Sequence, residues 1–210
     1  MELQVKKLGD LNKPIIEFAN DVMIAEESLE KDDTPYNRRN YIRTVFAMIE
    51  GSIFLLKQAT LSAAISGNKA VLSIADIAIL SEKSFDISNK GEPHSQTKFF
   101  QIEVNFKYTI HIINKIFDCN IVLDTSSEEW NRFVRSVKIR NRITHPKSLK
   151  DFYVSKNEIN MVCMFDSWFN EIIAQSVEGI YKRISRQERR EKDVLHPPSV
   201  APAEVADDIS

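Results

Sequence analysis

The chain has 210 residues, enough for one domain with its own hydrophobic core. It contains 28 Lys and Arg against 30 Asp and Glu, and the net charge of −2 argues against a protein that binds nucleic acid through an overall basic surface. Only 5 residues are glycine. Because sheets with tight turns use glycine and helices exclude it, the composition favours an all-α fold.

Two long helices are predicted in the first third of the chain. Apolar residues recur at helical spacing after Pro14, which predicts a helix from there to about Glu30. Thr34 followed by Pro35 is typical of a helix start, since a hydroxyl caps the first turn and proline fits its first position. The apolar stripe that follows predicts a second helix to about Ile65.

Three more helices are predicted in the second half of the chain. They cover residues 98–118, 128–144 and 155–184 or beyond. Capping boxes that begin at Ser126 and Ser155 open the last two of these helices. Pro146 ends the helix that precedes it, because the residue before a proline is biased away from helical geometry.

The remaining segments are short or polar. A capping residue at Ser73 predicts a helix to about Ser81, and the polar stretch 85–96, with its Asn, Gly and Pro, is interpreted as a loop. Gly51, inside the second long helix, indicates close helix packing or a kink. We therefore expect an antiparallel bundle of five to six helices over residues 1–192 and a disordered, proline-containing tail over residues 193–210.

The two cysteines, Cys119 and Cys163, lie in apolar stretches and show neither a disulfide framework nor the C-x-x-C spacing of a metal site. We interpret them as buried thiols in a reducing compartment. The N-terminal residues lack the apolar stretch of a signal peptide, and the apolar run 71–80 is short and interrupted by Asp76. The sequence therefore predicts a cytoplasmic protein that needs no membrane, metal or cofactor.

A basic segment stands out from the nearly neutral whole. Residues 129–150 contain seven basic side chains and one acidic side chain, so this stretch carries +6 and the rest of the chain −8. A solvated helix face is the simplest explanation of such a run. The end of the segment, Arg140-Asn141-Arg142-Ile143-Thr144-His145, nevertheless contains residue types that perform chemistry.

This six-residue sequence resembles the R-[N/D/H]-x-x-x-H motif of the HEPN family, with Arg140, Asn141 and His145 at its defining positions. The resemblance implies an all-α bundle and a metal-independent endoribonuclease, often a homodimer in which the motifs of two protomers face one cleft. It also implies a role as a toxin of a toxin–antitoxin system or as an antiphage effector. RNA is then the substrate, and an antitoxin or another neutralising protein is a possible partner.

The chemistry of these residue types agrees with that function. RNA cleavage by the 2′-hydroxyl needs a base such as His145 and a cation such as Arg140 to stabilise the charged transition state. Asn141 and His145 are four residues apart on one helix face, so the amide can orient the imidazole ring. Further cations of the segment are then expected to hold RNA phosphates: Arg132, Arg135, Lys138, Arg142, Lys147 and Lys150.

Structural alternatives exist for the same residues. His145 can act as a helix C-cap, and Arg140 can form a salt bridge to a neighbouring helix. A helical module that binds RNA, a nucleotide or a partner protein without catalysis would use the same basic helix. The aromatic stripe of Phe165, Trp168 and Phe169 is interpreted as core or dimer interface, not as a platform for stacking bases.

Overall fold

The computed structural model describes residues 2–66 and 72–195. Its elements are α1 (Glu2–Lys31), α2 (Pro35–Ser66), α3 (Ile74–Leu80), β1 (Lys83–Ile87), β2 (Pro93–Thr97), α4 (Ile102–Phe117), α5 (Glu128–Thr144), the 3-10 turn η1 (Leu149–Phe152) and α6 (Lys156–Leu195). The mostly helical architecture confirms the predicted all-α character, with one two-stranded sheet added.

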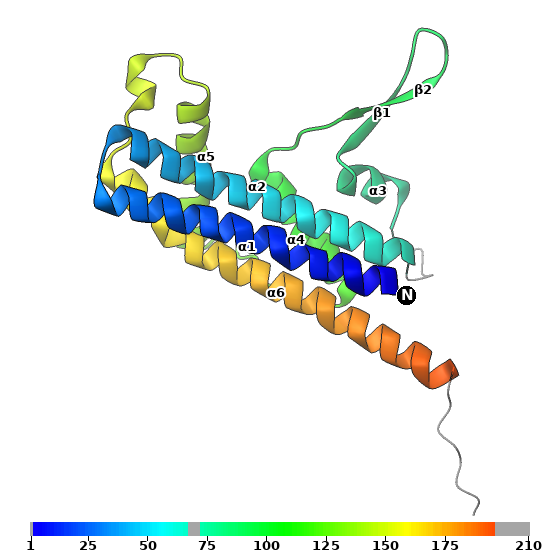
Figure 1. The fold of residues 1–210 in the computed structure, drawn as a ribbon. Coiled ribbons are helices and arrows are strands. Elements are labelled where there is room, and N and C mark those ends of the chain that lie inside the picture. Colours follow the sequence, from blue (N-terminus) through cyan, green and yellow to red (C-terminus); the bar gives the residue numbers. More distant parts are fainter. Residues whose placement is uncertain (1, 67–71, 196–210) are drawn as a thin grey trace, which may run out of the picture.

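The long helices α1, α2 and α6 run alongside one another, and α2 packs against α1, α4, α5 and α6 (Figure 1). α1 runs opposite to α2, whereas α6 runs in the same direction as α2, so the bundle is not wholly antiparallel (Figure 1). Two parts project from the same side of these helices: α3 with the hairpin β1–β2, and the end of α5 with η1 (Figure 1).

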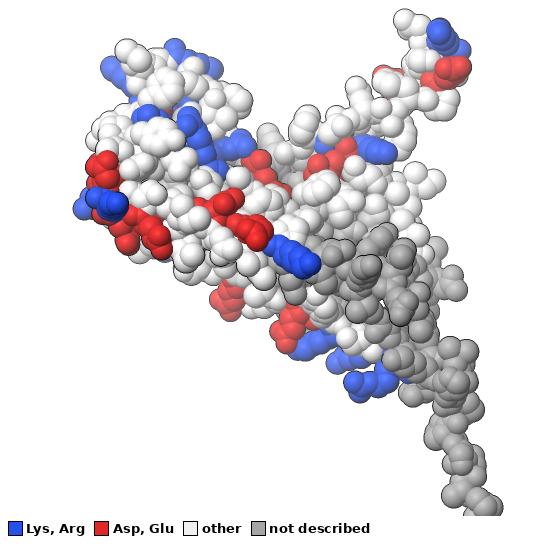
Figure 2. All heavy atoms as spheres, in the orientation of Figure 1, with Lys and Arg blue, Asp and Glu red and all other residues white. Residues whose placement is uncertain are grey.

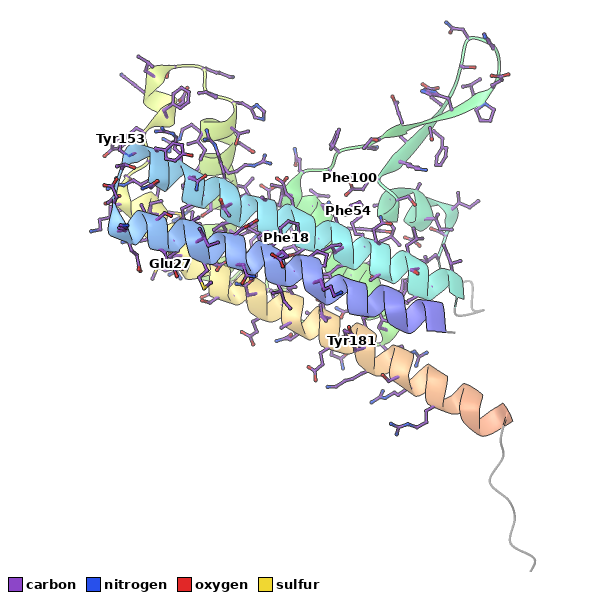
Figure 3. All side chains as sticks on the ribbon, in the orientation of Figure 1. Phe18, Glu27, Phe54, Phe100, Tyr153 and Tyr181 are labelled. Atoms are coloured by element: carbon purple, nitrogen blue, oxygen red, sulfur yellow. The ribbon has the colours of Figure 1, made fainter. Side chains whose placement is uncertain are left out.

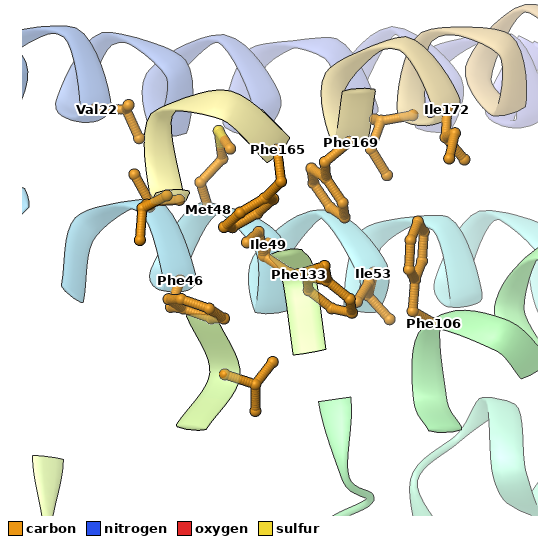
Figure 4. Close-up of a cluster of buried hydrophobic side chains, with 14 of the residues drawn as sticks. Val22, Phe46, Met48, Ile49, Ile53, Phe106, Phe133, Phe165, Phe169 and Ile172 are labelled. Atoms are coloured by element: carbon orange, nitrogen blue, oxygen red, sulfur yellow. The ribbon is translucent and has the colours of Figure 1, made fainter. Parts of the chain in front are cut away.

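The core is a cluster of aromatic and aliphatic side chains between α2, α4, α5 and α6 (Figure 4). Phe106 of α4 lies with its ring centroid 5.1 Å from that of Phe169 and 5.8 Å from that of Phe133. Phe165 and Phe169 of α6 are fully buried, which confirms the interpretation of that stripe as core. Burying each such ring contributes roughly 1.5–3 kcal/mol, so the cluster is a main source of the bundle's stability.

Several predicted helix starts are confirmed by their capping contacts. The Thr34 hydroxyl accepts a hydrogen bond from the backbone N–H of Asn37, three residues into the turn that it caps. Ser73 and Asp76 form a reciprocal capping box at the start of α3. At α6, the Ser155 hydroxyl accepts from the Glu158 backbone, and the Glu158 carboxylate accepts from the Ser155 backbone.

Other predicted boundaries were wrong. α1 begins at Glu2, and Pro14 lies inside it. The predicted start was wrong because the same apolar pattern follows a proline in the first turn of a helix and a proline within a longer helix. α5 is capped by Ser127, whose hydroxyl accepts from the Trp130 N–H, while Ser126 bonds to Asp124 instead. The end of α6 at Leu195 agrees with the helix predicted to reach residue 184 or beyond, and residues 193–195, assigned to the predicted tail, belong to this helix. The rest of the predicted tail, from residue 196 onward, lies outside the described residues.

The stretch predicted as a loop over 85–96 forms a hairpin, with Lys83 opposite Thr97 and Ile87 opposite Pro93. Its turn uses Gly91 at a φ of 77°, a conformation that favours glycine. The Ser88 hydroxyl accepts from two backbone N–H groups of the same turn. The strands are almost wholly exposed, so no alternation of apolar and polar residues marks them in the sequence.

A buried lysine fixes the base of the hairpin to the bundle. Lys57 of α2 is 0% exposed and donates from Nζ to Glu82 Oε1 and to Asn105 Oδ1, both at 2.9 Å. Burial lowers the pKa of Lys57, and the Glu82 carboxylate opposes that shift. These two bonds join α2, the corner before β1 and the start of α4, and they hold that corner in one place.

Gly51 lies where the Phe18 ring of α1 packs against α2. A Cβ at this position would collide with the Phe18 ring of α1, and Figure 3 shows Phe18 between the two helices. The close packing predicted for Gly51 is therefore confirmed.

α2 is long and apolar enough over Pro35–Ile65 to cross a membrane by length and composition alone. Half of its most apolar stretch is buried inside the bundle, and the core helices of soluble proteins meet the same criterion.

Candidate active site

A groove of about 950 Å³ lies between the two projecting parts, with α2 as its floor (Figure 2). Its walls come from three stretches far apart in the sequence: α2, the segment from the hairpin into α4, and the end of α5. The lining residues are Glu50, Ile53, Phe54, Glu82, Phe99, Phe100, Gln101, Ile102, Glu103, Asn105, Val137, Arg140, Asn141 and His145.

The three residues that define the predicted motif all line this groove. Arg140 has a side chain that is 23% exposed, and its Nη1 donates to Asn141 Oδ1 at 3.0 Å. Its Nη2 donates to Glu50 Oε1 of α2 in a close ion pair. The structure thus contains the salt bridge to a neighbouring helix that the sequence left open as an alternative.

His145 is the C-cap of α5, and its backbone N–H donates to the Asn141 carbonyl at 3.0 Å. Its side chain is exposed, and within the described part of the chain its imidazole makes no hydrogen bond. Asn141 does not orient the ring as expected, because its amide oxygen accepts from the Arg140 guanidinium. The imidazole is free to meet a ligand in the groove.

Arginines of α2 hold the connection between α5 and α6 in place. Arg43 donates to the Ile143 carbonyl at 3.0 Å, Arg38 to the Val154 carbonyl at 2.9 Å, and Arg39 to the Phe152 carbonyl at 3.2 Å. These carbonyls lie at a helix end and in a loop, where no helical N–H can reach them. The arginine bonds therefore fix the backbone on both sides of His145.

None of the six cations predicted to hold phosphates lines the groove. Arg142 pairs with Glu158 at 2.7 Å, and Arg132 pairs with Glu128 at 3.5 Å. The others, Arg135, Lys138, Lys147 and Lys150, are exposed and form no side-chain ion pair among the described residues. Figure 2 shows Lys and Arg atoms gathered on the projection formed by α5 and η1, beside the groove and not inside it.

The groove also contains aromatic residues that belong to no recognisable sequence motif. The helix predicted over residues 98–118 would include Phe99, but α4 begins at Ile102 and Phe99 is 88% exposed. Phe54 of α2 is 44% exposed, and Figure 3 shows it near Phe100 at the base of the hairpin. The adjacent Phe99 and Phe100, directly before the N-cap of α4, are the sequence signal that could have indicated these aromatic residues.

A second ionisable cluster lies away from the groove, between α1, α2 and α6. Burial, and then the nearby Glu26 carboxylate, raise the pKa of Asp166 to about 6. One carboxylate oxygen of Asp166 is buried without a hydrogen bond. Next to it, Cys163 Sγ lies 3.3 Å from the Tyr41 hydroxyl, and burial raises the pKa of both groups. A raised thiol pKa means that Cys163 is a poor nucleophile.

Both cysteines are free and half-buried. No group of three or more potential metal ligands occurs within residues 2–66 and 72–195. No known family profile, no curated protein and no solved structure matches this chain.

Proposed function

We propose that the protein is a metal-independent endoribonuclease of the HEPN type that acts as a homodimer. The observation that carries this proposal is that Arg140, Asn141 and His145 all line one groove. A guanidinium and an accessible imidazole in one cavity supply the cation and the base that cleavage by the RNA 2′-hydroxyl uses.

The reaction follows from these groups. His145 accepts the proton of a 2′-hydroxyl, whose oxygen attacks the adjacent phosphorus, and the bond to the 5′-oxygen breaks. Arg140 stabilises the negative charge on the phosphate oxygens in the transition state. The leaving 5′-oxygen takes up a proton from a second acid, a role for the partner protomer's copy of the same histidine. The products carry a 2′,3′-cyclic phosphate and a 5′-hydroxyl.

The ion pair between Arg140 and Glu50 has a consequence for substrate binding. The guanidinium is already neutralised, so an RNA phosphate must displace the Glu50 carboxylate to reach it. Both side chains are partly exposed, at 23% and 42%, and such pairs contribute only about 1 kcal/mol or less. A phosphate with a good fit can therefore replace the carboxylate.

The test is cleavage of RNA in the presence of EDTA, with analysis of the product ends. Arg140→Ala and His145→Ala are expected to lower the rate at least about a hundredfold. Arg189→Ala and His111→Ala are matched controls, because both residues are exposed and lie outside the groove. If folded Arg140→Ala and His145→Ala variants cleave as well as the wild type, the assignment of the site is wrong.

The acidic lining of the groove favours a second candidate, a non-catalytic module that binds a partner protein. Glu50, Glu82 and Glu103 all line the cavity, whereas the predicted phosphate-binding cations do not. This candidate predicts tight binding without turnover, and binding that survives His145→Ala. A neutralising protein of the toxin–antitoxin kind would also be expected to bind over this groove and stop cleavage.

A further inference from the structure

The wall of the groove opposite the motif contains aromatic rings that the bundle does not cover. Phe99 is 88% exposed two residues ahead of Gln101, the N-cap of α4, and Phe54 contributes a second ring from α2, at the floor of the groove beside this wall. Exposed rings of this size lose the favourable free energy of burial. In a groove beside Arg140 and His145, they offer a stacking surface for a base of bound RNA.

Next to these rings lies a carboxylate without a partner. Of the three glutamates in the groove, Glu50 is paired with Arg140 and Glu82 with Lys57. Glu103 is half-buried in the first turn of α4, and it makes no hydrogen bond or ion pair within the described residues. Its two oxygens are available to accept hydrogen bonds from a ligand.

The four RNA bases differ in what they offer to such a carboxylate. Guanine has two adjacent donors on its Watson–Crick edge, N1–H and the 2-amino group, which match two carboxylate oxygens. Adenine and cytosine offer one amino group beside a ring nitrogen acceptor, and uracil offers one N–H between two carbonyls. Only guanine can therefore form two hydrogen bonds with Glu103 without repulsion.

We propose that Phe99 and Glu103 form a subsite for an unpaired guanine base, next to the phosphate bound by Arg140. This inference rests on the proposed ribonuclease function. Phe99 supplies stacking energy for any base, while Glu103 supplies the preference for guanine. The base must be unpaired, because its Watson–Crick edge is the edge that Glu103 contacts.

The experiment measures binding separately from cleavage. His145→Ala protein is titrated into fluorescein-labelled hexauridylate and into versions with one internal guanosine, adenosine or cytidine, and anisotropy gives the dissociation constants. We expect the guanosine oligonucleotide to bind about tenfold more tightly than the others, in line with a bidentate contact to a base. Addition of Glu103→Gln should reduce this preference to about twofold or less.

Matched controls separate the two contacts. Glu129→Gln changes a half-buried glutamate in the first turn of another helix, outside the groove, and should keep the full preference for guanosine. Phe99→Ala should weaken binding of all four oligonucleotides about tenfold, as the loss of one stacked base predicts. Phe85→Ala, at an exposed ring of β1 outside the groove, should leave binding unchanged.

The outcomes distinguish this inference from the proposed function. Equal binding of all four oligonucleotides, or a guanosine preference that persists in Glu103→Gln, overturns the subsite even if RNA is cleaved. Guanosine-selective binding that depends on Glu103, without cleavage by the wild type, supports the subsite and overturns the ribonuclease. Binding of an arginine-containing peptide that depends on Glu103, with no base preference, shows that the subsite receives protein and overturns our proposal.

Discussion

Two ion pairs connect α2 to the walls of the groove, and they differ in burial. Lys57 is fully buried and reaches Glu82 and Asn105, whereas Arg140 and Glu50 meet at the surface of the groove. The first pair cannot exchange its partners without exposing an uncompensated charge to the interior. The second is open to solvent and to ligands. One wall is therefore held to α2 by an ion pair with a buried lysine, and the other carries Arg140, whose ion pair is accessible to a ligand.

The largest effect on stability is expected from breaking the buried pair. Lys57→Met keeps much of the aliphatic chain but leaves Glu82 without its cation, and should lower the free energy of unfolding by about 2–4 kcal/mol. Urea denaturation measures this loss. Lys115→Met is the matched control, since Lys115 pairs with Asp76 at 3.4 Å and is 41% exposed, and it should change stability by less than about 1 kcal/mol. Similar losses in both variants would show that Lys57 does not fix the hairpin.

Asp166, a carboxylate that forms no ion pair among the residues that the structure describes, extends the comparison. The pKa of Asp166 is raised to about 6, above its ordinary value of 3.8, so the folded state favours the protonated form. Its destabilising effect is absent below pH 3.8, grows as the pH rises towards 6, and is complete above 6. Asp166→Asn should therefore stabilise the protein by about 1–3 kcal/mol at pH 8 and have little effect at pH 4.

Chemical denaturation of wild type and Asp166→Asn across this pH range measures that difference. Asp151→Asn is a contrasting control, because hydrogen bonds from the Lys147 and Ser148 backbone lower the pKa of Asp151. A pH-independent effect of Asp166→Asn would show that this carboxylate does not titrate as proposed.

The exposed pair should affect binding more than stability. Glu50→Gln removes the competitor for the Arg140 guanidinium and should change the free energy of unfolding by less than about 1 kcal/mol. With His145→Ala protein, RNA affinity is expected to rise about threefold to fivefold, which anisotropy at fixed salt can measure. Glu17→Gln, an exposed substitution on α1 outside the groove, should leave affinity unchanged. Weaker RNA binding by Glu50→Gln would indicate that Glu50 positions Arg140 and does not compete for it.

The two walls of the groove also differ in how far the sequence could predict them. Arg140, Asn141 and His145 lie within one turn and a half of one helix, so a local motif identifies them together. Phe99 and Glu50 reach the same groove from distant stretches, and only the packing of α2 against α4 and α5 brings them there. Local sequence patterns do not predict which distant residues come together when the helices pack.

The same distinction applies to the fold. Helix starts with a capping box, such as those of α3 and α6, were predicted correctly because their hydrogen bonds join residues three apart. The hairpin was missed because its strands are exposed on both faces and have no apolar period. No local pattern indicates the role of the three arginines near the start of α2, because their bonds to the connection before α6 join residues 100 or more apart.

The contact of Gly51 with Phe18 links the packing of α1 to the position of the groove floor. Glu50 and Gly51 are neighbours on α2, yet one lines the cavity and the other receives the Phe18 ring of α1. α2 therefore forms the floor of the groove and also packs against α1. A side chain added at Gly51 would displace α1 or α2 and so move Glu50 without altering any residue of the cavity. The shape of this groove therefore depends on the packing of α1 against α2 as well as on the residues that line it.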